Sequence, residues 1–197
     1  MSPSQPTLPH EESTPGLERP ATAFLSYARE DKEEITSLQQ YLKVRGLRAW
    51  RDVTDLALGG FTRTEIIQAI EQESDTFVIY VTPQCLTSDF IWDVEVPAAL
   101  CRQEHDPRFH IVPVLRGVSF AELQLCCMAR GYRSLTEFNG IPLPDPTTAQ
   151  TQENFKSELR SVAERTLKAA LTVRLRRAGA DRNYYFSVNI ELAVRAL

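Results

Sequence analysis

Short apolar runs alternate with stretches of helical periodicity along most of the chain. The bounded apolar runs predict four buried strands, at residues 21–26, 47–51, 76–82 and 110–115. The stretches between them repeat apolar side chains three and four apart and predict helices, at residues 31–44, 62–73 and 88–104. The run at 76–82 is apolar almost throughout, which is typical of a parallel sheet covered on both faces.

The pattern is less regular toward the C-terminus. It predicts a short helix at 119–130, a weak fifth strand at 132–138, a proline-rich loop at 142–146 and a long amphipathic helix at 153–177. Pro113 lies within the fourth strand and indicates an edge or irregular position, because proline cannot donate to a strand ladder. Residues 83–87 are expected to form a loop, with Ser88 as the N-cap of the next helix.

Five alternating strand–helix units predict an α/β protein with an open five-stranded parallel sheet and helices on both faces. Five strands favour the flavodoxin-like order 2-1-3-4-5. A sheet of this kind binds ligands beyond the carboxyl ends of its strands, at the switch point between strands 1 and 3. The loops after Ser26, Trp50 and Thr82 are therefore where a site is expected.

Length and charge divide the chain into parts. Its 197 residues suffice for one domain and a remainder. The proline-rich residues 1–20 are expected to be a disordered leader, 21–178 the domain, and 179–197 an extension or the start of a truncated second domain. Residues 1–154 hold 13 Lys and Arg against 22 Asp and Glu, whereas 155–182 hold 8 against 3. We interpret the basic segment as a solvated helix face, and the acidic balance argues against direct nucleic-acid binding.

Composition also indicates a compartment. No apolar run approaches the roughly 18 residues of a membrane-spanning helix, and no secretory signal precedes the domain. The four cysteines form no Cys-x-x-Cys pair, and the three histidines do not lie at zinc-ligand spacing beside them. We expect reduced thiols in a cytoplasmic protein, with no metal and no bound cofactor.

The three loops lack the usual catalytic and phosphate-binding motifs. They contain no Gly-x-Gly-x-x-Gly, no Walker-type sequence and no nucleophile elbow. Trp92 and Glu95 are three residues apart on the helix after strand 3. Taken alone, Trp-x-x-Glu is more often a core tryptophan and a solvated glutamate. Pro97 is expected to kink this helix or to end it early.

Four segments together resemble a Toll/interleukin-1 receptor (TIR) domain over about residues 21–177. They are Phe24-Leu-Ser-Tyr-Ala-Arg-Glu-Asp31, then Gly46-Leu-Arg-Ala-Trp-Arg-Asp52 before the loop that ends in Gly59-Gly60, strand 74–82, and Ser88-x-x-x-Trp-x-x-Glu95. These sequence motifs are similar to those of prokaryotic TIR proteins of the NAD⁺-cleaving type.

This resemblance implies a function and a set of site residues. Some TIR domains cleave the nicotinamide–ribose bond of NAD⁺ with a glutamate at the position of Glu95, giving ADP-ribose or cyclic ADP-ribose. NAD⁺ is then the substrate, and activity depends on self-assembly with other TIR domains, in an immune or cell-death type defence response under a fused or separate sensor. The substrate-binding residues implied are Ser26, Tyr27, Arg29, Trp50, Arg51, Asp52 and Trp92.

Two other functions are compatible with parts of the pattern. Other TIR domains are non-enzymatic interaction modules. If this chain is one of them, Glu95 is a surface residue without a catalytic role. A phosphoacceptor receiver domain shares the strand order but needs an aspartate at the end of strand 3, where this chain has Tyr80-Val-Thr82. Trp50 is either a stacking platform for the cationic nicotinamide ring or a buried strand-end aromatic. Arg29 either meets the pyrophosphate or is a surface arginine.

Overall fold

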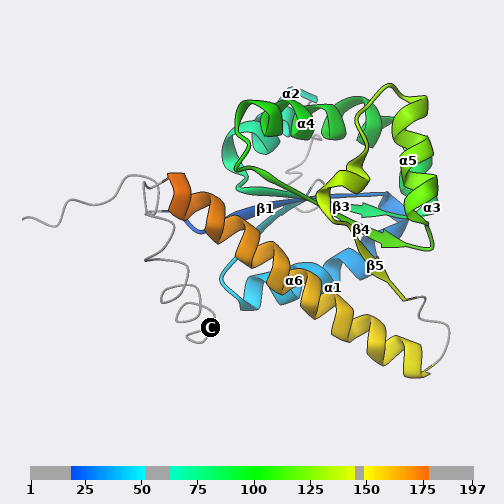
Figure 1. The fold of residues 1–197 in the computed structure, drawn as a ribbon. Helices are drawn as coiled ribbons and strands as arrows, with labels where there is room; N and C mark the ends of the chain where they lie inside the picture. The colour runs from blue at the N-terminus through cyan, green and yellow to red at the C-terminus, as the bar shows by residue number, and fades with distance from the viewer. Residues whose placement is uncertain (1–18, 52–62, 145–148, 178–197) are drawn as a thin grey trace, which may run out of the picture.

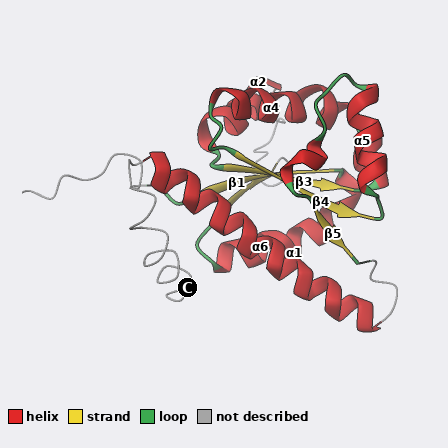
Figure 2. Ribbon diagram, in the orientation of Figure 1, coloured by secondary structure: helices red, strands yellow, loops and turns green. Residues whose placement is uncertain are grey.

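Among the described residues, five parallel strands form one sheet at the centre of the structure (Figures 1 and 2). The computed structural model describes residues 19–51, 63–144 and 149–177. The strand order is β2-β1-β3-β4-β5, and every pairing is parallel. The strands are β1 Thr22–Tyr27, β2 Arg48–Arg51, β3 Thr76–Val81, β4 His110–Arg116 and β5 Ile141–Leu143. The predicted flavodoxin-like architecture is confirmed.

Helices cover both faces of this sheet (Figure 1). One face carries α1 (Lys32–Val44) and α6 (Ala149–Arg177). The other carries α2 (Arg63–Gln68) with the π-helix η2 (Ala69–Glu73), the π-helix η3 (Ile91–Glu95) with α4 (Val96–His105), and α5 (Phe120–Ala129). The short connecting helices are η1 (Arg29–Asp31), α3 (Pro83–Thr87) and η4 (Leu135–Phe138).

Alternate residues of the central strands point into two separate cores. Phe24, Phe77 and Ile79 pack under α2, η3 and α4, whereas Leu25 and Val78 pack under α1 and α6. All of these side chains are 1% exposed or less. A strand buried on both faces reads as a continuous apolar run, which explains why residues 76–81 gave such a clear signal.

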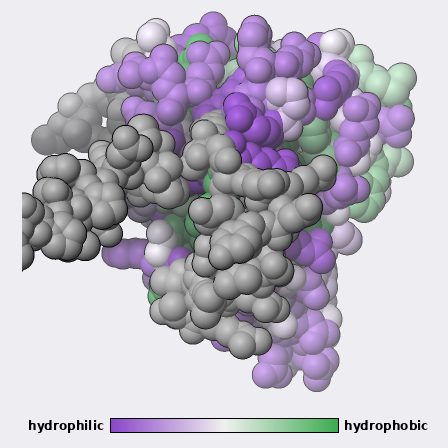
Figure 3. Space-filling view, turned by 60° about the vertical axis from the view of Figure 1, so that its left-hand side comes forward, coloured by the Kyte–Doolittle hydropathy of each residue, from purple (hydrophilic) through white to green (hydrophobic). Residues whose placement is uncertain are grey.

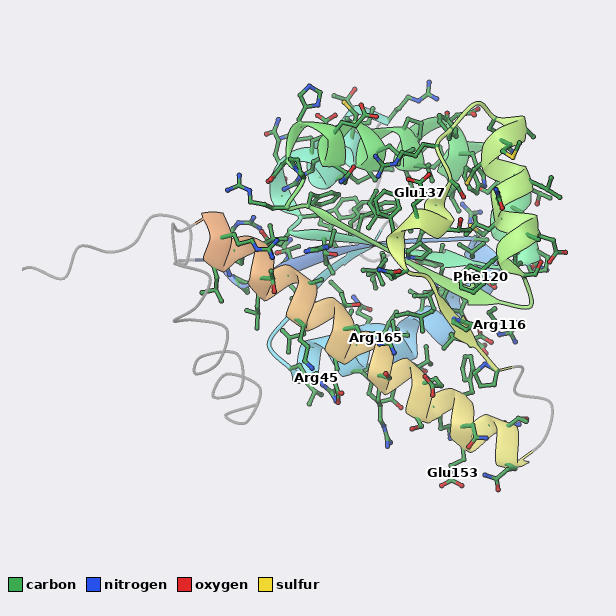
Figure 4. All side chains as sticks on the ribbon, viewed as in Figure 1. Arg45, Arg116, Phe120, Glu137, Glu153 and Arg165 are labelled. Carbon is green, nitrogen blue, oxygen red and sulfur yellow. The ribbon has the colours of Figure 1, made fainter. Side chains whose placement is uncertain are left out.

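The helices α1 and α6 lie side by side and run in the same direction (Figures 1 and 4). Near its C-terminus, α1 places Arg45 at 3.0 Å from Glu164 of α6. One turn earlier, the guanidinium of Arg160 lies 5.5 Å from the ring centroid of Tyr41. Beneath these surface contacts, both helices bury apolar stripes, as their periodicity predicts. Gly46 ends the α1 segment with a φ of 74°, the left-handed conformation expected at this C-cap.

The fifth strand was predicted in the wrong place. Residues 135–138 form the 3₁₀ helix η4, and the strand is Ile141–Leu143, within the expected proline loop. Tyr132, Leu135 and Phe138 are three apart, a period that suits a 3₁₀ helix better than a strand. In β5, Pro142 is exposed between two buried residues, and an edge strand tolerates a proline.

The segment after β3 also differs from the prediction. Residues 83–87 form helix α3 instead of a loop, with Thr82 as N-cap and Pro83 in the first turn. Ser88 is the C-cap of α3, and its carbonyl accepts from the amide of Trp92 at 3.2 Å, so a helix resumes at once.

Pro113 lies in a strand with neighbours on both sides, but β5 begins to pair only at Val114. At Pro113 itself the strand is paired with β3 alone in the described register.

The described residues begin at Arg19, which lies inside the expected leader. Arg19 forms an ion pair of 3.1 Å with the buried Asp75. The remaining predictions for residues 1–18, the Gly59-Gly60 loop and residues 179–197 lie outside the described residues.

Candidate functional site at the switch point of the sheet

Glu95 lies beside the carboxyl end of β1, where the sheet meets the helices of one face. It is the last residue of η3, and it is only 3% exposed. Ser26 is the next-to-last residue of β1, and its hydroxyl donates to Oε2 of Glu95 at 2.5 Å. A buried carboxylate requires such donors, because an unpaired charge in the interior is strongly disfavoured. The structure therefore brings together two predicted site residues that lie 69 positions apart.

This position is the topological switch point of the sheet. β1 leads into α1 on one face, whereas the segment after β3 leads into η3 and α4 on the other. β1 and β3 are neighbours, with Ser26 in register with Ile79. The connections diverge here, and open α/β sheets hold their ligands at such a point.

A π-helical turn sets the backbone that carries Glu95. The amide of Val96 donates to the carbonyl of Ile91, five residues back instead of four. Pro97, at the start of α4, has no amide hydrogen to continue the ladder. Single π-turns within helices occur frequently at functional sites. Pro97 therefore accompanies a disturbed helix, as predicted, and the helix nevertheless continues to His105.

Trp92 is placed to support this turn. Its side chain is 0% exposed, and its indole Nε1 donates to the carbonyl of Cys85 at 2.9 Å. The guanidinium of Arg130 lies 5.7 Å from its ring centroid. The indole is therefore enclosed by the protein on the turn that carries Glu95, and its contact with substrate stays a prediction.

Trp50, in β2, is 4% exposed and stacks on Phe24, with ring centroids 4.8 Å apart and an interplanar angle of 19°. One indole face is therefore covered by the core. This packing matches the strand-end alternative for Trp50. A ligand ring would have to meet the opposite face.

The other predicted contact residues differ in accessibility. Tyr27 ends β1 and is 9% exposed, whereas Arg29 begins η1 and is exposed. Arg51 ends β2 in register with Leu25, so its backbone lies at the same edge of the sheet. Asp52 lies outside the described residues.

Sequence reasoning missed a second buried carboxylate near the switch point. Asp31 is 9% exposed, and the hydroxyl of Thr82 donates to its Oδ2 at 2.7 Å. Burial raises the pKa of Asp31, while the hydrogen bond from Thr82 and the charge of Arg116 act in the opposite direction. This bond ties the end of the β1 loop to the end of β3. Both residues lie in the loops singled out for the site, but nothing in their spacing predicts the pair.

Cys85 lies close enough to both carboxylates for their charges to act on its thiol. It is fully buried, its amide donates to Thr82 Oγ1 at 3.1 Å, and its thiol pKa is raised first by burial and then by Glu95 and Asp31. A thiol with a raised pKa is a poor nucleophile. Cys85 is therefore a packing residue of the site. All four cysteines are free thiols.

On the face covered by α1 and α6, a polar network lies at the carboxyl ends of β3 and β4. The hydroxyl of Tyr80 donates to Glu34 at 2.5 Å, and Glu34 pairs with Arg116 at 2.8 Å. Burial, reinforced by Glu34, raises the pKa of Tyr80. Figure 4 shows Arg116 at the end of β4, where the sheet approaches α6.

In the described part of the chain, no cluster of three or more His, Cys, Asp or Glu side chains is arranged to hold a metal ion. No helix within residues 19–51, 63–144 and 149–177 is long and apolar enough to cross a membrane.

Several solved structures are similar to this chain at low sequence identity. The structure is similar to the TIR domains of the activated Roq1 resistosome that recognizes the effector XopQ, at 16% identity over 89% of this chain and 96% of that chain, with a TM-score of 0.47. It is also similar to the TIR domain of the Toll-related receptor TRR-2 from Hydra magnipapillata, at 17% identity over 72% and 96%, with a TM-score of 0.43. A CheY-like receiver domain from Methanospirillum hungatei JF-1 is 13% identical over 74% and 98%, with a TM-score of 0.35.

The sequence comparisons are more specific. No curated protein sequence matches the chain. The family model described as TIR domain matches residues 23–141, which is more than half of the chain. The chain belongs to the TIR domain family.

Proposed function

We propose that this TIR domain is an NAD⁺ glycohydrolase of the prokaryotic type, with Glu95 as its catalytic carboxylate. The observation that carries the proposal is the buried pair at the switch point, where the hydroxyl of Ser26 donates to Glu95 at 2.5 Å. A buried carboxylate that is held in a fixed direction by a hydrogen bond is suited to stabilising positive charge. The receiver-domain alternative still lacks an aspartate at the end of β3.

The chemistry needs one carboxylate. The bond between the ribose C1′ and the pyridinium nitrogen breaks, and its electron pair leaves with nicotinamide, which becomes neutral. The ribose acquires oxocarbenium-ion character, as in glycoside hydrolysis, and the charge of Glu95 stabilises it. Water then bonds to C1′ and loses a proton, giving ADP-ribose; attack by an adenine nitrogen of the same molecule gives the cyclic product instead.

The neighbouring residues have proposed roles in binding. Arg29 is exposed at the start of η1, where its charge suits the pyrophosphate. Trp50 is assigned to the cationic nicotinamide ring, because an indole attracts a cation. Tyr27 and the backbone of Arg51 lie at the same edge of the sheet. These two residues and Asp52, the next residue in the sequence, are assigned to the ribose and the adenine side.

The proposal includes control by assembly. An enzyme that consumes NAD⁺ must stay inactive until it is triggered, and self-association with other TIR domains supplies a threshold in concentration. We place this activity in a cytoplasmic defence or cell-death response. A fused or separate sensor would raise the local concentration of the domain.

The test is nicotinamide release from NAD⁺, followed across a series of protein concentrations. The wild type should release nicotinamide with a rate per molecule that rises with concentration. Glu95→Gln, which keeps the shape of the side chain, should release it at least about 100-fold more slowly. Glu104→Gln, an exposed change on α4, is the matched control and should behave as the wild type.

One observation favours a second function as an interaction module. The helix α5 exposes Phe120, Leu125 and Met128, of which Leu125 is 65% exposed and Met128 64%. Figure 4 shows Phe120 at the start of this helix, and Figure 3 shows that apolar residues gather at one edge of an otherwise hydrophilic described surface. Exposed apolar groups of this kind often mark protein contacts. Under this alternative, concentrated wild type releases no nicotinamide.

A further inference from the structure

The carbonyl of Trp92 loses both of its helical donors. In an α-helix it would accept from the amide of Val96, but that amide donates to Ile91 instead. In a continuing π-helix it would accept from residue 97, which is a proline without an amide hydrogen. A buried carbonyl without a donor is unfavourable, so this turn requires a partner from elsewhere in the molecule.

Tyr132 supplies that partner. Its hydroxyl donates to the carbonyl of Trp92 at 2.9 Å, and its ring stacks on the indole with centroids 6.5 Å apart. The ring is held from its own backbone, because the amide of Tyr132 donates to the carbonyl of Cys127 at 2.9 Å at the end of α5. Gly131 makes this approach possible with a φ of 75°.

A second side chain contacts the same turn. Pro97 also removes the α-helical donor of the Asp93 carbonyl. The guanidinium of Arg63, at the start of α2, donates to that carbonyl at 3.3 Å. The bond from Arg63 is longer and exposed, whereas the bond from Tyr132 is half-buried.

We infer that Tyr132 is a positioning residue for Glu95: its hydroxyl completes the π-turn of η3 and so fixes the direction in which Glu95 leaves the helix toward Ser26. The inference rests on the proposed function for its catalytic consequence, but not for its structural one. Without the hydroxyl, the carbonyl of Trp92 lacks a donor. The turn is then more stable if the amide of Val96 donates to Trp92, as in an α-helix, instead of to Ile91. That exchange shortens the turn and rotates Glu95 away from Ser26.

Hydrogen exchange tests, without NAD⁺, whether Tyr132 stabilises the π-turn of η3. In the full chain, Tyr132→Phe keeps the ring and removes only the hydroxyl. We expect amide exchange in the peptide covering 91–97 to become at least about fivefold faster, with exchange in β3 unchanged. The matched control is Tyr80→Phe, which removes a hydroxyl bonded to Glu34 on the opposite face and should leave exchange in 91–97 as in the wild type.

Kinetics and a second variant test the catalytic half. Tyr132→Phe should lower kcat for nicotinamide release about tenfold, with KM within about twofold, because the substrate contacts remain. Pro97→Ala restores a helical donor and should also lower kcat. The double variant should lower it no further than the more damaging single change, because both act on one turn.

The outcomes separate this inference from the proposed function. Unchanged exchange in 91–97 for Tyr132→Phe overturns the inference, whether or not the wild type cleaves NAD⁺. Faster exchange with an unchanged kcat also overturns it, since the turn would then not position Glu95. A wild type that releases no nicotinamide contradicts the proposed function alone, and faster exchange there still supports the role of Tyr132 in the turn.

Discussion

The two faces of the sheet are covered by helices of different regularity. The α1–α6 face has two uninterrupted helices that pack side by side over an apolar core. The opposite face has two helices that each contain a π-helical segment, η2 and η3, and it buries the Ser26–Glu95 pair. Both faces bury an apolar core, but only the irregular face places a π-helical turn beside the Ser26–Glu95 pair. Of the two π-helical segments, η3 carries Glu95 at the switch point, whereas η2 precedes the amino end of β3.

The largest effects are expected when a buried side chain is removed from either face. Both changes should lower stability, but only the one beside Glu95 should abolish activity. Trp92→Ala removes a fully buried indole from the irregular face and should lower the free energy of unfolding by about 3–5 kcal/mol, while Leu38→Ala on α1 should lower it by about 2–5 kcal/mol. Urea denaturation measures both. At a temperature where both variants are folded, only Trp92→Ala should lose nicotinamide release. Equal losses of activity would show that the faces do not differ in function.

Ser26→Ala tests the bond that defines the irregular face. Loss of a hydrogen bond to a charged group should slow nicotinamide release by about 10- to 100-fold. Ser37→Ala, on α1 of the regular face, is the control and should release nicotinamide at the wild-type rate. Initial rates at one saturating NAD⁺ concentration suffice. A wild-type rate for Ser26→Ala would remove Ser26 from the site.

Asp31 provides a test through pH. Burial raises its pKa above the ordinary value of 3.8, so the folded state binds this proton more tightly than the unfolded chain. Ionisation of Asp31 therefore lowers stability as the pH rises from 3.8 through the raised pKa, and no further above it. Asp31→Asn cannot ionise and keeps an oxygen for Thr82. Its melting temperature relative to that of the wild type should rise across that window. A difference that is independent of pH would contradict the assignment.

The smallest effect is expected at the surface of the regular face. Glu164→Gln breaks the 3.0 Å pair with Arg45, in which the Glu164 side chain is 51% exposed. Exposed pairs contribute little, so the free energy of unfolding should change by less than about 1 kcal/mol. Denaturation and nicotinamide release should both match the wild type. A larger change would mean that the α1–α6 contact depends on charge.

The strands β1 to β4 and the two helical layers were predictable because apolar periodicity directly reflects burial, and the strand order followed from the topology of five-stranded open parallel sheets. Residues 76–81 are buried on both faces and read as strand, and Ile35, Leu38 and Leu42 are buried on one helix face at the expected spacing. The fifth strand was mispredicted because β5 is only three residues long and contains Pro142. A strand of that length has too few residues to show a period.

The candidate site was predictable only in part. The switch-point rule and the TIR resemblance located Ser26 and Glu95, and the structure places them in contact. The enclosure of Trp92 and the contact from Tyr132, 40 residues away, follow from a π-turn that no periodicity reveals. A hydrogen bond to a backbone carbonyl leaves no pattern of residue types. Only the three-dimensional arrangement shows which side chain supplies it.

The most direct test of the account is the initial rate of nicotinamide release from NAD⁺ by concentrated wild type, Glu95→Gln and Glu104→Gln. The account predicts release by the wild type and by Glu104→Gln, and a rate at least about 100-fold lower for a folded Glu95→Gln. No release by the wild type at any concentration, or undiminished release by Glu95→Gln, would contradict it.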